Sequence, residues 1–186
     1  NKVYAKCLYG CHRDIVVEND VTVVTEYPNG ATGTFVTCTH DAIGTDRLEI
    51  DLDGGKIVVE NSKTATVYRM TKTENEMNET MDMLEVAKLT SGNSAGGGLF
   101  TIETIENVDG WGKQHTTVME NFAMNILEGT PLLAPGSDGI NGVNLANASQ
   151  LSAWTGREVA NPVDPEEYAA ELNKRIAAEG KFPVRE

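Results

Sequence analysis

The first seventy residues consist of short runs of β-branched and alternating residues, each closed by a tight-turn signal. The run over residues 21–27 stops at Pro28-Asn29-Gly30. The runs over 47–52 and 56–60 are separated only by Asp53-Gly54-Gly55. Short turns join neighbouring strands that run in opposite directions, so this half of the chain predicts antiparallel hairpins.

Helical periodicity dominates the remainder. A helix is predicted over 74–89, opened by a capping box of Thr73 and Glu76. A strand is predicted over 99–108, and Thr117 with Glu120 predicts a second capping box and helix. Two further helices and a short strand before Pro162 follow; their boundary signals are Asp138, Gly156 and Asp164-Pro165-Glu166.

Strands that come mostly first and helices that come mostly later predict an α+β fold. We expect a large, mainly antiparallel open sheet with helices packed on one face. At 186 residues the chain is the size of one domain, so residues 1–186 are expected to form a single domain. The uncovered sheet face must then meet water, a partner subunit or another domain.

The charge balance excludes two classes of partner. The 28 acidic residues outnumber the 15 basic ones and give a net charge of −13, which repels phosphate backbones and anionic lipid. We therefore expect no nucleic acid and no membrane as partners. No apolar run approaches the roughly 20 residues that span a bilayer. Three cysteines are too few for a disulfide framework, which favours a reducing, cytoplasmic location.

Two motifs that suggest cofactor chemistry have simpler explanations. Residues 92–98 are rich in glycine, but a helix is predicted before them and a strand after, the reverse of a dinucleotide-binding loop, so a flexible linker is expected. Five residues are of the types that bind zinc: Cys7, Cys11, His12, Cys38 and His40. Adjacent residues of a strand point to opposite faces and no CxxC occurs, so we expect buried cysteines, surface histidines and no metal site.

Two polar loops are candidates for substrate binding. His12, Arg13 and Asp14 separate two apolar strand patterns, and Lys113 and His115 follow a tryptophan and a glycine. Such side chains suit hydrogen bonds to a polyhydroxylated ligand. The alternative is that His115 only satisfies a helix end and the first loop is merely solvated. No catalytic residue is predicted, because the spacing contains no Ser/His/Asp or Cys/His arrangement.

An ordered series of short motifs resembles the substrate domain of the Gfo/Idh/MocA oxidoreductases. The series covers nearly the whole chain and consists of Glu18-Asn19-Asp20, Asn29-Gly30-Ala31-Thr32-Gly33-Thr34, Gly44, Leu48-Glu49-Ile50, Gly54-Gly55-Lys56-Ile57, Asn121-Phe122, Ile126, Gly129-Thr130-Pro131, Asn147-Ala148, Ser152, Gly156-Arg157-Glu158-Val159 and Pro162.

The resemblance implies the C-terminal half of a two-domain dehydrogenase. An N-terminal Rossmann domain, absent from this chain, would hold NAD or NADP, and the substrate would be a sugar, cyclitol or related polyol. The present domain would line the substrate site and form a homo-oligomer through its sheet face. A strand pattern that begins already at Lys2 also favours a larger parent protein.

The family's cofactor glycine motif, its Glu-Lys-Pro segment and its Asp-x-x-x-His motif are all missing here. Hydride transfer requires the cofactor to be held against the substrate, so the isolated chain is expected to be inactive and to bind no cofactor. Two alternatives remain. One is a standalone, non-catalytic module for ligand binding or dimerisation, and the other is a zinc-dependent enzyme built on the cysteine and histidine residues.

Overall fold

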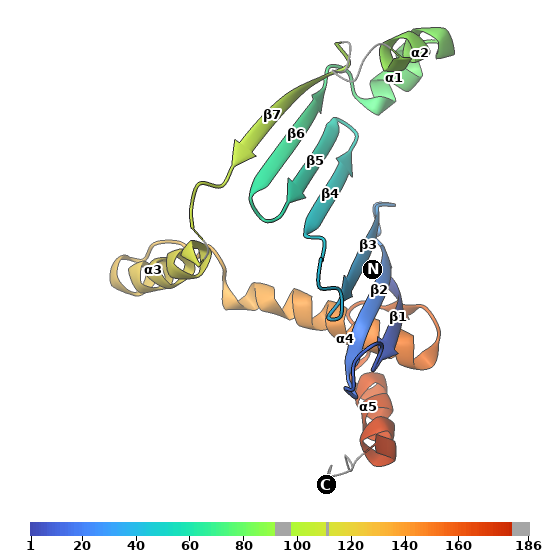
Figure 1. Ribbon diagram of the computed structural model, residues 1–186, viewed down its shortest axis with the longest axis vertical. Helices are drawn as coiled ribbons and strands as arrows, with labels where there is room; N and C mark the ends of the chain where they lie inside the picture. The colour runs from blue at the N-terminus through green and yellow to red at the C-terminus, as the bar shows by residue number, and fades with distance from the viewer. Residues whose placement is uncertain (92–97, 111, 180–186) are drawn as a thin grey trace. The chain divides into compact units, whose positions relative to one another are not determined.

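The computed structural model describes residues 1–91, 98–110 and 112–179. The chain divides into two compact units (Figure 1): a first unit of Asn1–Ala42 and Val118–Glu186, and a second unit of Ile43–Thr117. Both contain antiparallel sheets and helices, so the predicted α+β class is confirmed. The strands form two four-stranded sheets, one in each unit. The glycine-rich segment 92–97 lies outside the described residues.

The sheet of the first unit has the order β3-β2-β1-β8. It is formed by β1 (Lys2–Tyr9), β2 (Glu18–Glu26), β3 (Thr32–Cys38) and β8 (Val159–Ala160). All three pairings are antiparallel, and the predicted β2–β3 hairpin is confirmed. The two-residue β8 pairs with β1 only at its beginning, so the rest of that edge of β1 has to find other hydrogen-bond partners.

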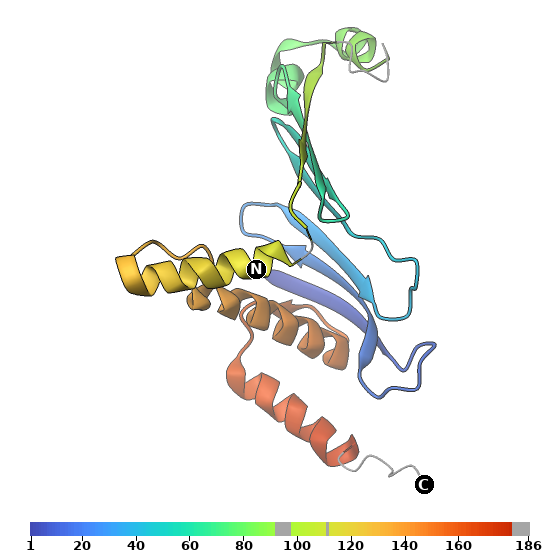
Figure 2. The same cartoon turned by 60° about the vertical axis from the view of Figure 1, so that its left-hand side comes forward.

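The core of the first unit lies between this sheet and α4 (Gly139–Thr155). Figure 2 shows α4 lying along one face of the sheet. Alternate residues of β1 are buried toward the helix, as expected for a strand with one covered face. The buried apolar cluster consists of Val3, Ala5, Val23, Ala148, Leu151 and Val159.

The predicted boundaries of the last two helices are confirmed. Gly156 ends α4 with a φ of 67°, a left-handed conformation that glycine adopts without strain. The next helix is α5 (Pro165–Glu179), and the carboxylate of Asp164 accepts hydrogen bonds from the amides of Glu166 and Glu167, both at 2.9 Å. Asp138, in contrast, makes no side-chain bond to α4, which follows directly on the short 3-10 helix Gly136–Asp138.

The helix α3 (Lys113–Glu128) begins four residues earlier than its predicted capping box at Thr117. The carbonyl of Gly112 accepts hydrogen bonds from the amides of His115 (3.1 Å) and Thr116 (3.3 Å), which starts the first turn before Thr117. The capping box of Thr117 and Glu120 was therefore a wrong prediction. Within the first unit, the side chain of Asn121 fixes the chain after the helix, since it bonds the backbone of Pro131 and Leu133.

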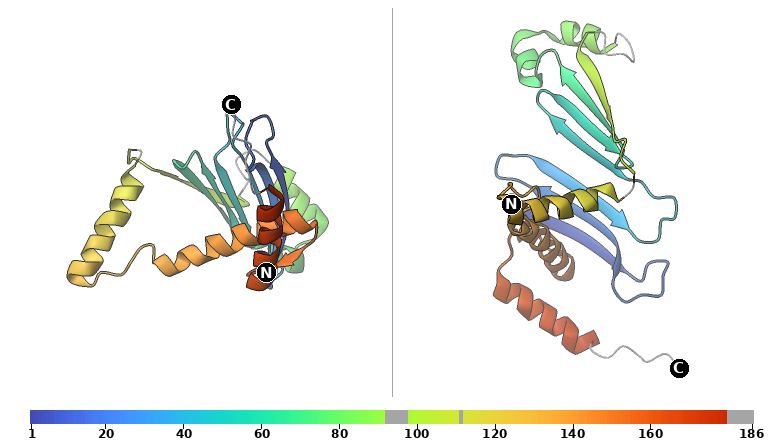
Figure 3. Two further views of the ribbon diagram at one scale, coloured as in Figure 1. Left: turned by 90° about the horizontal axis from the view of Figure 1, so that it is seen from below. Right: turned by 90° about the vertical axis from the view of Figure 1, so that its left-hand side faces the viewer.

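The second unit contains an antiparallel sheet of order β4-β5-β6-β7, whose strands lie side by side in Figure 3. Its strands are β4 (Arg47–Leu52), β5 (Gly55–Glu60), β6 (Thr64–Met70) and β7 (Phe100–Glu106). The predicted β4–β5 hairpin is confirmed. Its turn requires glycine at its end, because a Cβ at Gly55 would lie 1.9 Å from the carbonyl oxygen of Tyr68.

The helix predicted over 74–89 is divided into α1 (Glu74–Thr80) and α2 (Met83–Ser91). The capping box of Thr73 and Glu76 at the start of α1 is confirmed. A second reciprocal pair then forms, in which Asp82 accepts from the amide of Glu85 and Glu85 accepts from the amide of Asp82, both at 2.9 Å. This second cap starts a new helix and explains the break.

Candidate functional site

The loop between β1 and β2 carries three of the five predicted substrate-binding residues. It leaves β1 at Gly10, whose φ of 61° suits glycine and where a Cβ would lie 2.9 Å from the carbonyl oxygen of Ile15. His12 also adopts a left-handed backbone, with a φ of 58°, which is uncommon for a residue with a side chain. The loop is therefore tightly turned rather than extended.

A buried asparagine determines the position of this loop. The side chain of Asn19 accepts a hydrogen bond from the amide of Cys11 at 2.8 Å and donates another to the Cys11 carbonyl. The backbone carbonyl of Asn19 also accepts from the amide of Thr39 at 3.0 Å. Asn19 itself is 2% exposed, so its side-chain amide is shielded from water and depends on these bonds. One residue thus anchors both the β1–β2 loop and the segment that follows β3.

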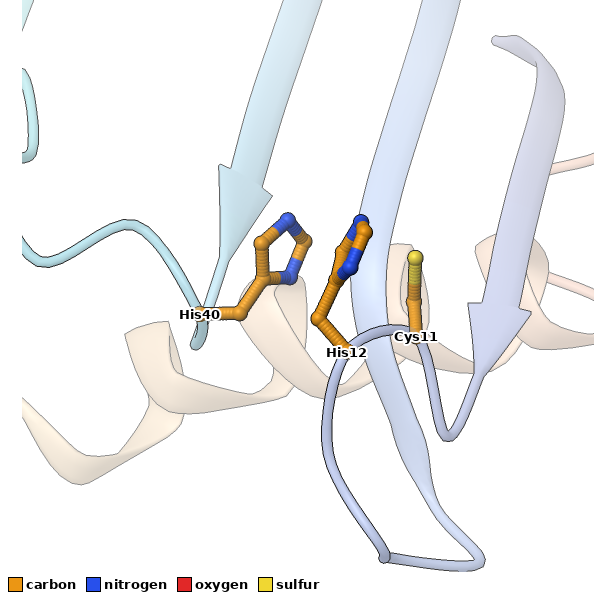
Figure 4. A group of neighbouring side chains, drawn as sticks. All are labelled: Cys11, His12 and His40. Carbon is orange, nitrogen blue, oxygen red and sulfur yellow. The ribbon is translucent and has the colours of Figure 1, made fainter.

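This anchoring brings two histidines and a cysteine together (Figure 4). Ligand atoms of Cys11, His12 and His40 all lie within 4.8 Å of one another, and the two imidazole rings have centroids 5.0 Å apart. Nε2 of His40 lies 3.8 Å from a carboxylate oxygen of Asp20. Cys7, on the face of β1 that α4 covers, is buried and does not belong to the group.

The other predicted residues lie at exposed positions. Arg13 and Asp14 are exposed in the β1–β2 loop next to His12. Lys113 and His115 are exposed in the first turn of α3, on the part of that helix that belongs to the second unit. The structure therefore joins His12, Arg13 and Asp14 in one loop, and it places Lys113 and His115 two residues apart within the first turn of a helix.

A polar network supports the base of the β1–β2 loop. Trp154 donates from Nε1 to the hydroxyl of Tyr9 at 3.0 Å, and Gln150 donates to Glu18 at 3.0 Å while accepting from the hydroxyl of Tyr168 at 2.6 Å. Partial burial raises the pKa values of both tyrosines above their usual value, so they remain neutral donors and acceptors. The network connects α4 and α5 to both ends of the loop.

Sequence reasoning missed Asn19 and Gln150 as residues that position the site. Asn19 could have been found, because asparagine is a poor strand former and its presence at the start of a β-branched strand indicates a role other than strand formation. Gln150 carried none, since its partner Glu18 lies 132 residues away in sequence.

A separate hollow of about 250 Å³ lies beside α3 within the first unit. Apolar side chains form most of its wall, so it offers few of the hydrogen-bonding groups that a polyhydroxylated ligand needs. The lining residues are Val118, Met119, Asn121, Phe122, Leu132 and Ala134.

Comparison with known families identifies the fold. Residues 8–161 match the sequence model of the Gfo/Idh/MocA family described as "Oxidoreductase family, C-terminal alpha/beta domain". The chain belongs to this oxidoreductase family and contains its C-terminal α/β domain. Curated proteins gave no sequence match.

Solved structures of oxidoreductases share the fold at low sequence identity. An oxidoreductase from Agrobacterium radiobacter in complex with NAD+, L-tartaric acid and magnesium has a TM-score of 0.57 and 15% identity, over 87% of this chain and 43% of its own. The aldose-aldose oxidoreductase from Caulobacter crescentus, complexed with glycerol, has a TM-score of 0.56 and 16% identity, over 85% and 40%. An oxidoreductase domain protein from Kribbella flavida gives 0.55 and 14%, over 84% and 44%.

The present chain thus spans less than half the length of each of these structures. Identities of this size establish the shared fold only. None of the helices in the described ranges combines the length and the apolar character needed to cross a membrane.

Proposed function

We propose that this chain is the substrate-binding and oligomerisation domain of an NAD(P)-dependent dehydrogenase that acts on a sugar, cyclitol or related polyol. The observation that carries the proposal is the family match over residues 8–161, on a fold shared with oxidoreductases more than twice as long. NAD or NADP would bind in an N-terminal Rossmann domain of the parent protein, because the family match here covers only the C-terminal domain.

The ligands of the related structures support a polyhydroxylated substrate. L-tartaric acid and glycerol both carry several adjacent hydroxyl groups. In the present chain, His12, Arg13 and Asp14 on one loop, and Lys113 and His115 at the start of α3, offer the donors and acceptors that bind such groups. Their proposed role is to orient the substrate, and hydride transfer itself would require residues and a cofactor of the other domain.

The gene and the full-length protein provide the test. We expect the coding sequence before Asn1 to encode a strand–GxGxxG–helix unit and a Glu-Lys-Pro segment. The full-length protein should then reduce NAD or NADP with at least one member of a panel of aldoses, cyclitols and hydroxy acids, and the isolated chain should not. A gene without a Rossmann domain would overturn the proposal, and ligand titration of the isolated chain would then test the standalone module.

Loop variants test the substrate-site assignment. In the full-length enzyme, Arg13→Ala and His115→Ala should raise KM at least threefold while the KM for the cofactor stays constant, because the side chains are assigned to substrate binding only. Lys63→Ala is a suitable control, since Lys63 is an exposed cation of the turn between β5 and β6. Unchanged substrate KM in both loop variants would remove these residues from the site.

The two faces of the second unit's sheet differ in a way that supports the proposed oligomer interface. The register aligns apolar side chains on one face, which we call the apolar face: Leu48, Val59, Ala65 and Ile105 in one row, then Ile50, Ile57 and Val67 in the next. Glu103 completes the second row on β7, and it pairs with Arg69 on the same face. Leu48 is 55% exposed and Ile105 is 52% exposed. The opposite, charged face carries ion pairs of Arg47 with Glu49 and Glu60, both at 2.7 Å.

An exposed apolar face of this kind would promote aggregation of a monomer in water, and a second copy of the chain would cover it. Two isoleucines of β7 provide a matched pair of variants, since Ile102 and Ile105 are both 52% exposed but point to opposite faces. Ile105→Asp should convert the oligomer to monomer in analytical ultracentrifugation, and Ile102→Asp should leave its molecular mass unchanged. An equal effect of both variants, or a monomeric parent, would contradict the interface.

A further inference from the structure

We propose that Cys11, His12 and His40 form a binding site for a thiolate- and imidazole-preferring divalent cation of the zinc type. The site lies in the first unit, at the end of the sheet where β1 and β3 stop and β2 begins. His12 is shared with the proposed substrate loop, but the test of the site uses the metal alone, without nucleotide or substrate, so its outcome does not depend on the proposed dehydrogenase function.

The three side chains come from two segments that the fold holds side by side. Cys11 and His12 lie in the β1–β2 loop, and His40 lies two residues beyond β3. Figure 4 shows the three side chains side by side and extending in the same general direction. Their ligand atoms lie within 4.8 Å of one another, whereas a tetrahedral zinc ion spaces nitrogen and sulfur ligands about 3.3 to 3.6 Å apart. The three ligand atoms therefore have to move slightly closer together to share one ion.

The usual objection to adjacent ligands does not apply in this loop. Neighbouring residues of a strand point to opposite faces, but Cys11 and His12 belong to a turn in which His12 has a φ of 58°. The left-handed residue lets both side chains point the same way. Asn19 fixes the positions of both segments, since it bonds the backbone of Cys11 on one side and of Thr39 on the other.

The two ring nitrogens of His40 have different surroundings. Its Nδ1 is buried and, within the described part of the chain, has no hydrogen-bond partner. Its Nε2 faces the carboxylate of Asp20 at 3.8 Å. A metal-bound histidine characteristically directs its second nitrogen toward a carboxylate, which sets the tautomer and the ring orientation. Nδ1 of His40 is therefore the atom assigned to the metal, with Asp20 behind it.

The donor set determines the class of cation. One thiolate and two imidazoles suit zinc and other borderline or soft metals, and magnesium and calcium require oxygen ligands instead. Three protein ligands leave one tetrahedral position for water or another donor. The bound ion would tie the β1–β2 loop to the end of β3, and it would thereby also restrict the neighbouring residues Arg13 and Asp14.

Titration of the whole reduced chain with ZnCl2, monitored by calorimetry, tests the site. We expect one ion per chain with a dissociation constant below 10 μM, a threshold on the order of the weaker protein metal sites. Cobalt(II) should give the visible spectrum of a tetrahedral complex together with a near-ultraviolet thiolate-to-cobalt band. Cys11→Ser should abolish that band, and His40→Gln should weaken binding at least tenfold.

Conservative variants keep the result interpretable. His12→Asn preserves a residue that tolerates the left-handed backbone, and it should weaken binding at least tenfold without loss of folding. Asp20→Asn should weaken binding by about 10- to 100-fold, the range for loss of a supporting carboxylate. Cys38→Ser and His115→Gln remove a cysteine and a histidine outside the cluster and should bind like the parent. Substoichiometric zinc, or equal losses in Cys11→Ser and Cys38→Ser, would overturn the proposal.

Discussion

The hydroxyl of Ser152 on α4 accepts a hydrogen bond from the backbone amide of Ala5 on β1 at 2.9 Å. The same hydroxyl donates to the carbonyl of Arg157 at 2.7 Å. Because β8 pairs only with Lys2 and Val3, the amide of Ala5 on that edge lacks a strand partner, and Ser152 takes the place of one. The fully buried Ser152 thus connects α4 to β1 and to the segment that follows the C-terminal end of α4.

Ser152→Ala should lower the free energy of unfolding by about 1 to 3 kcal/mol, because the amide of Ala5 then remains buried without a partner. Denaturant unfolding followed by circular dichroism measures this change. Ser149→Ala is a matched control, since the hydroxyl of Ser149 bonds the Leu145 carbonyl within its own helix. Equal effects of the two variants would show that Ser152 acts through local helix packing alone.

Asn19→Ala should release the β1–β2 loop and destabilise the first unit by about 2 kcal/mol, because the buried side-chain amide loses both of its bonds to the backbone of Cys11. Hydrogen exchange at the Cys11 amide should accelerate at least tenfold. Asn29→Ala is the control, as Asn29 also bonds a turn amide, that of Ala31, but at an exposed position. If exchange at Cys11 stays slow in Asn19→Ala, the loop is fixed by other contacts.

The sequence predicted elements whose causes are local. Hairpins, turn glycines, the Thr73–Glu76 capping box and the Asp164 cap each depend on residues a few positions apart, and the structure contains all of them. The break after α1 depended on a second, overlapping cap at Asp82 that competes with the continuous helical pattern. When a capping signal and a helical periodicity of similar strength overlap, the sequence does not reveal which of the two will determine the helix boundary.

Features that depend on distant residues were less accessible. The grouping of Cys11, His12 and His40 requires both the strand register and the backbone conformation of His12, and the sequence pattern supplies only the first. The partition of the strands into two sheets likewise depends on which edges pair across the chain. The substrate loops at His12 and Lys113 remain predictions, because polyol sites are built from scattered groups without a linear signature.

Asp164→Ala should lower the free energy of unfolding by about 1 kcal/mol, because two amides in the first turn of α5 lose their acceptor. Asp138→Ala is the matched control. Both aspartates directly precede a helix, but Asp138 makes no capping bond to α4. Thermal unfolding should therefore shift for Asp164→Ala and remain within error for Asp138→Ala. A larger effect at Asp138 would contradict the described helix starts.

Burial raises the pKa of the Cys7 thiol, and the nearby negative charge of Glu18 raises it further. The folded chain then keeps a proton that the unfolded chain releases above about pH 8.5. The contribution of Cys7 to the free energy of unfolding is therefore fully present below that pH, and it is lost as the pH rises through the folded-state pKa. We expect Cys7→Ala to flatten this decline between about pH 7.5 and 9.5. Urea unfolding over that range measures it, and an unchanged slope would show that Cys7 does not contribute.

Trp154 of α4 makes three different contacts, two with α5 and one with β1. Its ring stacks on Tyr168 with centroids 5.5 Å apart, the guanidinium of Arg175 lies 4.5 Å from the ring centroid, and Nε1 donates to Tyr9. Trp154→Leu removes all three, and α5 should loosen by about 1 to 2 kcal/mol. Amide hydrogen exchange along α5 measures this change. Exchange in the β1–β2 strand pair is the internal reference and should change much less.

Trp154→Phe separates the contributions of these contacts, since phenylalanine keeps an aromatic face but lacks the indole donor. Exchange along α5 should stay close to that of the parent if stacking on Tyr168 and Arg175 is dominant. Faster exchange equal to that of Trp154→Leu would instead assign the attachment of α5 to the bond with Tyr9. In that case the position of α5 and the base of the β1–β2 loop would be coupled, and changes in one should be detectable in the other.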